Sequence, residues 1–100
     1  MIAGTVQLTG VRATVQPDGR VKIHFSLSPP TLVAEVTIKN EAGQVVRILK
    51  QQRGPVAFWD RKDERGQPVP PGKYTIEVTA KQRTEFTTSQ VNASVVINLK

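Results

Sequence analysis

The stretch from Val56 to Tyr74 holds the residues whose types and spacing come closest to a chemical site. The single tryptophan, Trp59, stands near its start, and the single tyrosine, Tyr74, stands at its end. From residue 60 to residue 65 three carboxylates are interspersed with three cations: Asp60, Asp63 and Glu64 with Arg61, Lys62 and Arg65. Neighbouring carboxylates can chelate Ca²⁺, which takes about six to eight oxygen ligands. The interleaved cations oppose such a site, so we predict no metal here.

Catalytic groupings are not evident elsewhere in the chain. The single histidine, His24, occupies an outward position in a predicted strand, and there is no cysteine. One histidine without cysteine does not make a transition-metal site. The sequence has neither a Gly-x-Ser-x-Gly nucleophile turn nor a glycine-rich phosphate loop. We therefore predict no catalytic residue, no metal ligand and no cofactor.

The Val56–Tyr74 stretch has two interpretations. In the structural one, Trp59 covers one end of the core, and loop carboxylates accept backbone N–H groups. Its motif residues would then be Trp59, Asp60, Asp63, Gly66, Pro70, Pro71, Gly72 and Tyr74. In the binding one, an exposed Trp59 ring stacks on a carbohydrate or another surface, helped by the cations Arg61, Lys62 and Arg65. Burial of the Trp59 ring distinguishes the two.

Charge and composition limit the partners. The formal net charge is +6, from 14 Lys and Arg against 8 Asp and Glu, which favours weak attraction to polyanions. The basic residues are scattered and alternate with Thr, Ser, Val or Ile, as on solvated strand faces. A dedicated nucleic-acid surface would show a cluster. We therefore expect no specific nucleic-acid partner and keep a polyanion-binding β-sandwich as an alternative. No apolar run is long enough to span a membrane, so we expect no membrane insertion.

The apolar residues follow a period of two in most of the chain, which is typical of half-buried strands. We predict strands at residues 5–9, 11–15, 20–27, 33–39, 44–50, 56–59, 73–81 and 91–99. Gly10 separates two apolar registers, which predicts a bulge or a bend where the chain changes sheets. Residues 82–90 either extend the preceding strand or form a hairpin tip. Turn signals every 8–12 residues or so are typical of sandwiches.

These elements predict an all-β fold, an Ig-like or fibronectin III-like antiparallel β-sandwich of seven or eight strands. Residues 1–100 form one domain, with Trp59 or Phe58 as the core aromatic residue. The strand at 91–99 lacks any charged residue. Because unprotected edges recruit partners, we predict that it either pairs with the N-terminal strand or is a contact edge. Asn92-Ala93-Ser94 matches a glycosylation acceptor but falls inside this strand.

Two passages resemble a known family. One is Val36-Thr37-Ile38-Lys39-Asn40-Glu41-Ala42-Gly43-Gln44-Val45-Val46-Arg47-Ile48-Leu49, and the other runs from Trp59-Asp60 through Gly66 and Pro70-Pro71-Gly72 to Tyr74. Together, over about residues 20–81, they resemble the FlgD-type Ig-like domain of the bacterial flagellar hook-capping (hook assembly scaffold) protein and of similar modules in bacterial secreted and surface proteins. Arg61 departs from the family pattern, which usually has Gly there.

The resemblance implies a structural or assembly module without catalysis. It implies an extracellular or cell-envelope location in bacteria, as part of a longer secreted protein. Its partners would be another protein or neighbouring domains of the same chain, with no membrane insertion, and the oligomeric state stays open. If the position of Arg61 requires a positive φ, that residue is strained or its turn differs.

Overall fold

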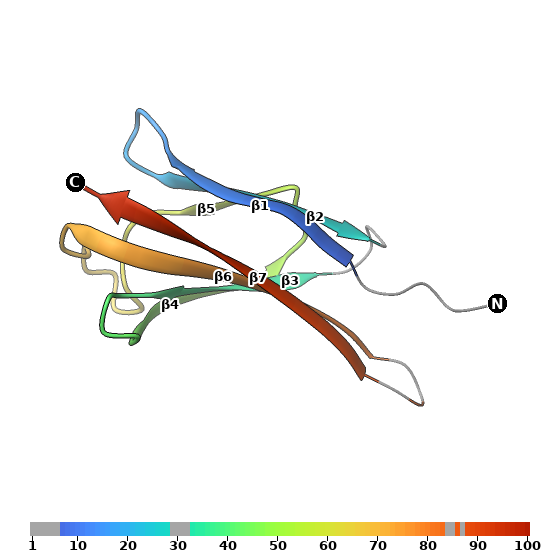
Figure 1. Ribbon diagram of the computed structural model, residues 1–100. Helices are drawn as coiled ribbons and strands as arrows, with labels where there is room; N and C mark the ends of the chain where they lie inside the picture. The colour runs from blue at the N-terminus through green and yellow to red at the C-terminus, as the bar shows by residue number, and fades with distance from the viewer. Residues whose placement is uncertain (1–6, 29–32, 84–85, 87) are drawn as a thin grey trace.

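The computed structural model describes residues 7–28, 33–83, 86 and 88–100. It is a sandwich of two antiparallel sheets, with strand orders β1-β2-β5 and β4-β3-β6-β7 (Figure 1). The strands are β1 (Gln7–Val15), β2 (Val21–Ser28), β3 (Ala34–Lys39), β4 (Val45–Gln52), β5 (Val56–Trp59), β6 (Gly72–Arg83) and β7 (Thr88–Leu99). The predicted all-β, Ig-like sandwich is confirmed.

The core lies between the sheets and is built from the alternate residues that the period-two pattern placed inward. Its buried members are Val21, Ile23, Phe25, Ala34, Val36, Ile38, Ala57, Trp59, Tyr74, Ile76, Val78, Ala80, Ile97 and Leu99. Each large apolar side chain buried in this way contributes about 1.5–3 kcal/mol relative to exposure. Of the two candidate core aromatics, Trp59 is fully buried, whereas Phe58 is 43% exposed on the opposite side of β5.

A bulge interrupts β1 at Gly10. Gly10 has a φ of 66°, and the register with β2 shifts between Thr9 and Arg12. The predicted bulge is therefore confirmed. The predicted change of sheet is wrong, because both halves of β1 pair with β2. The extra residue lets the chain switch its inward parity within a single strand.

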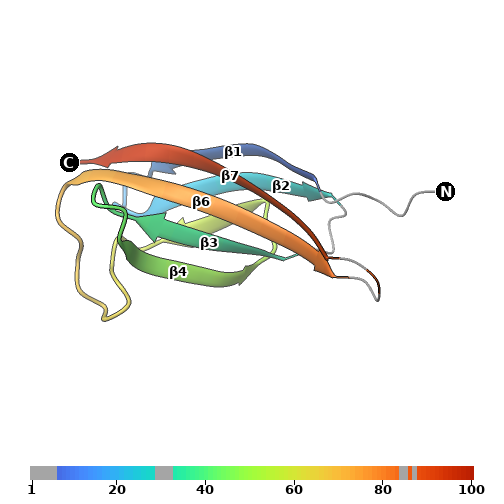
Figure 2. The same ribbon diagram turned by 60° about the horizontal axis from the view of Figure 1, so that its bottom comes forward.

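β6 and β7 form a long antiparallel hairpin. Their ladder runs from the pair Gly72–Leu99 to the pair Arg83–Thr88, past the last β3–β6 pair at Ala34–Ala80. Of the predicted 82–90 segment, residues 82–83 extend β6 and residues 88–90 begin β7, while residues 84, 85 and 87 lie outside the described part. The hairpin extends past the ends of β3 and β4 (Figure 2).

β7 lies at the edge of the four-stranded sheet and pairs with β6. The predicted pairing of the 91–99 strand with the N-terminal strand is wrong. β1 lies alongside β7 at the side of the sandwich without sharing a backbone ladder with it (Figures 1 and 2). The other predicted option, an edge strand, matches this geometry.

Candidate functional site

The two aromatic residues of the Val56–Tyr74 stretch pack together at one end of the core. Trp59 is 0% exposed and Tyr74 3%, and their ring centroids lie 5.6 Å apart in an edge-to-face arrangement. The Trp59 Nε1–H donates to the Lys62 carbonyl at 2.9 Å, and the Tyr74 hydroxyl donates to the Pro70 carbonyl at 2.6 Å. Burial raises the pKa of the Tyr74 phenol. A ring buried in this way offers no face to a sugar, so the carbohydrate interpretation loses its platform.

The two aspartates shape the loop by accepting backbone N–H groups. Asp60 Oδ1 accepts from the Lys62 amide at 3.1 Å. Asp63 Oδ1 accepts from the amides of Arg65 and Gln67 at 2.9 and 3.0 Å. These are the local bonds by which aspartate stabilises turns. The carboxylates are thus engaged within the protein, as the structural interpretation expects.

Glu64 attaches the loop to the outer edge of β4. Its amide donates to the Val46 carbonyl at 3.1 Å, and its Oε1 accepts from the Ile48 amide at 2.6 Å. Glu64 thereby imitates one residue of a neighbouring strand. This docking covers backbone groups that an edge strand otherwise leaves open.

Arg47, which the sequence interpretation did not single out, joins β4 to the loop. Its Nη1 lies 3.4 Å from Asp60 Oδ1 and 3.3 Å from the carbonyls of both Lys62 and Asp63. Its side chain is only 26% exposed. One signal was available: Arg47 is the one charged residue within the apolar run from Val45 to Leu49.

Arg61 adopts the left-handed backbone conformation, with a φ of 63°. The position thus has a positive φ although the glycine usual in the family pattern is absent. An L-residue with a Cβ is disfavoured there by about 1–2 kcal/mol. The guanidinium reaches the Lys100 carbonyl at 3.2 Å, which ties the loop to the end of β7.

The turn at Pro70-Pro71-Gly72 leads the chain into β6. Gly72 has a φ of 147°, which favours glycine, and the next amide, that of Lys73, donates to Glu41 Oε1 at 3.4 Å. Gly66 has a φ of 79° in the tight reversal closed by its amide on the Asp63 carbonyl. Each glycine stands where the backbone needs positive φ.

The predicted binding cations do not converge on one point. Arg61 is directed to the Lys100 carbonyl, while Lys62 and Arg65 are exposed on the loop. The hollow beside Arg65 has a volume of about 240 Å³ and is lined by Val45, Val46, Asp63, Glu64 and Arg65. Within the described residues, no group of three or more His, Asp or Glu side chains is placed to hold a metal ion. These residues hold the loop in its conformation and do not form a shared binding site for a ligand.

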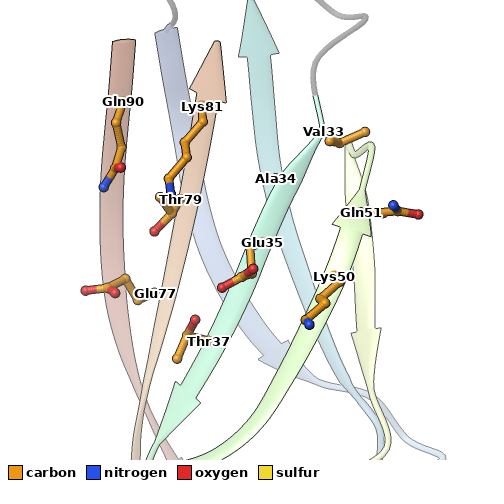
Figure 3. A pocket seen from close by; sticks show the side chains of 10 residues that line it. All are labelled: Val33, Ala34, Glu35, Thr37, Lys50, Gln51, Glu77, Thr79, Lys81 and Gln90. Atoms are coloured by element: carbon orange, nitrogen blue, oxygen red, sulfur yellow. The ribbon is translucent and has the colours of Figure 1, made fainter. Parts of the chain in front are cut away.

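A wider hollow lies on the outer face of the four-stranded sheet (Figure 3). Its volume is about 380 Å³. Glu35 and Glu77 lie there with Lys50 and Lys81, among threonines and Gln90 (Figure 3). The charges are mixed, and no aromatic side chain lines the hollow. It has the character of a solvated sheet face.

Comparison with known proteins adds one finding to this geometry. A family model described as FlgD Ig-like domain matches residues 10–84, more than half of the 100 residues and all of the loop motif. The searches of curated proteins and of solved structures give no match. Residues 7–28, 33–83, 86 and 88–100 contain no helix long and apolar enough to cross a membrane.

Proposed function

The chain belongs to the FlgD Ig-like domain family, and from this premise we propose that it is a non-catalytic assembly module of a bacterial extracellular or cell-envelope protein. It is one domain of a longer chain, related in role to the Ig-like domain of the flagellar hook assembly scaffold. Its partners are another protein or neighbouring domains of its own chain.

One observation carries the proposal: the residues of the family motif are engaged in internal contacts. Trp59 and Tyr74 are buried and donate to loop carbonyls, and Asp63 accepts two loop amides. A motif that serves catalysis keeps nucleophiles or titratable groups open to a substrate. A motif engaged in this way instead preserves the shape of the end of a sandwich, as a spacer or docking module requires.

The outer side of β7 supports the assembly role. β7 is an edge strand of twelve residues, and none of them is charged. Natural monomers commonly protect such edges with charges, prolines or bulges. Addition of a strand from a partner to an open edge is a recurring mode of protein recognition.

The test is an in-frame deletion of this domain from the coding sequence of the parent protein in its bacterial host. We expect the remaining protein to be produced but to fail in assembly at the envelope or outside the cell, as followed by cell fractionation and electron microscopy. Normal export and normal assembly of the deleted protein would contradict the proposal. A substrate turned over by the isolated domain would contradict its non-catalytic part.

A further inference from the structure

The outer face of the three-stranded sheet gathers basic residues that are scattered in the sequence. Residues directly opposite one another in antiparallel strands point to the same side of a sheet. The register therefore places two rows across β1, β2 and β5, namely Arg12–His24–Val56 and Thr14–Lys22–Phe58. We call these six residues, together with Arg20, the basic face.

Arg20 completes the basic face from the turn before β2. Its guanidinium carbon lies 4.4 Å from the centre of the Phe58 ring, a cation–π contact. Its Nε also pairs with Asp18 Oδ2 at 2.8 Å. Asp18 is the carboxylate at this face; the other described acidic residues lie elsewhere, at Glu35, Glu41, Asp60, Asp63, Glu64 and Glu77.

The cations of the basic face are close enough to repel one another. Neighbouring strands lie about 4.8 Å apart, which is less than the Debye length of about 8 Å at physiological ionic strength. Partial desolvation lowers the pKa of His24, and the positive charges of Arg12 and Lys22 lower it further. The outer face of the other sheet is different, since its glutamates and lysines are mixed (Figure 3).

We propose that the basic face binds a carboxylate-rich, extended segment of a protein partner. The inference rests on the proposed assembly function and names the chemistry of one partner. Carboxylates of such a segment would pair with Arg12 and Lys22, relieving the repulsion between these cations. Apolar side chains at other positions on the same side of the segment would cover Val56 and Phe58, of which Phe58 is 43% exposed.

The aromatic residue favours a protein segment over a nucleic acid. Proteins that bind single strands stack bases on open aromatic faces. The Arg20 guanidinium already covers a face of the Phe58 ring. Val56 and Phe58 together form a short apolar strip on β5, at the edge of the sheet. A strip of this kind suits the apolar side chains on one side of an extended polypeptide.

The experiment measures binding of a fluorescein-labelled peptide to the 100-residue chain by fluorescence anisotropy. The peptide has the repeat Glu-Ser-Val-Ser, which places Glu and Val on the same side of an extended chain. The double variant Arg12→Glu/Lys22→Glu is compared with Lys39→Glu/Lys81→Glu, which makes the same charge change on the other sheet. We expect the first variant to weaken binding about tenfold or more and the second to leave it within about twofold. The same peptide with Gln in place of every Glu should not bind.

Several outcomes would overturn the inference. Equal losses in the two double variants would show that net charge alone attracts the peptide. Tighter binding of heparin or of double-stranded DNA than of the peptide, at about 0.15 M salt, would make the face a polyanion surface. Circular dichroism and Trp59 emission check folding, and Arg12→Gln/Lys22→Gln replaces the reversal variant if that variant unfolds.

The outcome is separable from that of the domain deletion. If the peptide does not bind but deletion of the domain still blocks assembly, only the inference about the basic face fails. If deletion of the domain leaves assembly intact, the proposed function fails whatever the peptide does.

Discussion

β4 and β7 form the two edges of the same four-stranded sheet, and their outer sides are built differently. Along β4, the loop places Glu64 against the backbone of Val46 and Ile48, and Arg47 binds the loop in return. Along β7, twelve uncharged residues pair with β6 on one side, and β1 lies nearby without a shared ladder. The loop covers the start of one edge at Val46 and Ile48, whereas the outer side of β7 has no strand paired to it.

The difference teaches where the motif acts. In the sequence, a loop that combines a tryptophan with several charged residues suggests a ligand site. In the structure the loop instead covers part of the outer edge of β4, where Glu64 bonds the backbone of Val46 and Ile48. Because an unprotected edge invites pairing with other chains, closing one edge confines such pairing to the other. The comparison can be tested by four changes, taken from the largest expected effect to the smallest.

Removal of residues 91–100 should unfold the domain. Ile97 and Leu99 are buried, and Val91 and Val95 pack against the core. Two large buried side chains contribute up to about 3–6 kcal/mol, a large part of a typical stability of about 5–15 kcal/mol. Loss of the cooperative thermal transition by circular dichroism is expected. Removal of Lys100 alone is the control and should leave the transition in place. A cooperative melt of the shorter chain would show that β7 is dispensable to the core.

Replacement of Arg47 by Met should loosen the loop from β4. The change removes the cation that faces two carbonyls and the Asp60 carboxylate. Hydrogen bonds to charged groups are worth about 1.5–3 kcal/mol, but partial exposure reduces this to a loss of about 1–2 kcal/mol. Urea unfolding measures the loss, and hydrogen exchange at the Ile48 amide should accelerate. Lys50→Met, on an exposed position of β4, serves as the control. Equal effects of the two variants would mean that Arg47 does not hold the loop.

Replacement of Arg61 by Gly should stabilise the domain. Glycine removes the cost of about 1–2 kcal/mol that an L-residue has in the left-handed conformation. Its greater freedom in the unfolded chain offsets about 0.5–1 kcal/mol of this gain. The free energy of unfolding should therefore rise by about 0.5–1 kcal/mol, which urea unfolding measures as a higher midpoint. Arg61→Ala separates the backbone from the side chain, because it keeps a Cβ and loses the contact to Lys100. If Arg61→Ala stabilises as much as Arg61→Gly, backbone strain is not the cause.

Local patterns were sufficient to predict much of this molecule. Period-two alternation identified the inward residues of β2, β3 and β6, and the motif resemblance pointed to the unusual backbone of Arg61. These properties depend on neighbours in the chain. The partner of β7, by contrast, depends on which strands meet in space. The alternating pattern of a strand does not specify which other strand it pairs with.

The role of Arg47 and the basic face were missed for the same reason. Arg47 reaches residues 13 to 16 positions away. Arg12, Lys22 and Phe58 become neighbours only through the register of β1, β2 and β5. In the sequence they look like separate solvated positions. Clustering of this kind follows from topology, which composition and spacing do not determine.

The smallest expected change in stability comes from Ser94→Lys on β7, together with Val45→Lys on β4. Ser94 is exposed and pairs with Glu77, and Val45 is 49% exposed. Exposed substitutions of this kind usually change stability by less than about 0.5 kcal/mol. A lysine on an open edge discourages pairing with other chains. We therefore expect Ser94→Lys to slow aggregation under agitation, followed by thioflavin T fluorescence.

Val45→Lys removes more apolar surface than Ser94→Lys but lies on the edge that the loop already covers. If exposed apolar area governs aggregation, Val45→Lys will slow it more. If the open backbone of β7 governs it, Ser94→Lys will slow it more, although it replaces only a polar residue. The first result would erase the distinction between the two edges. The second would show that β7, rather than the β4 edge that the loop partly covers, is the edge through which copies of this domain pair.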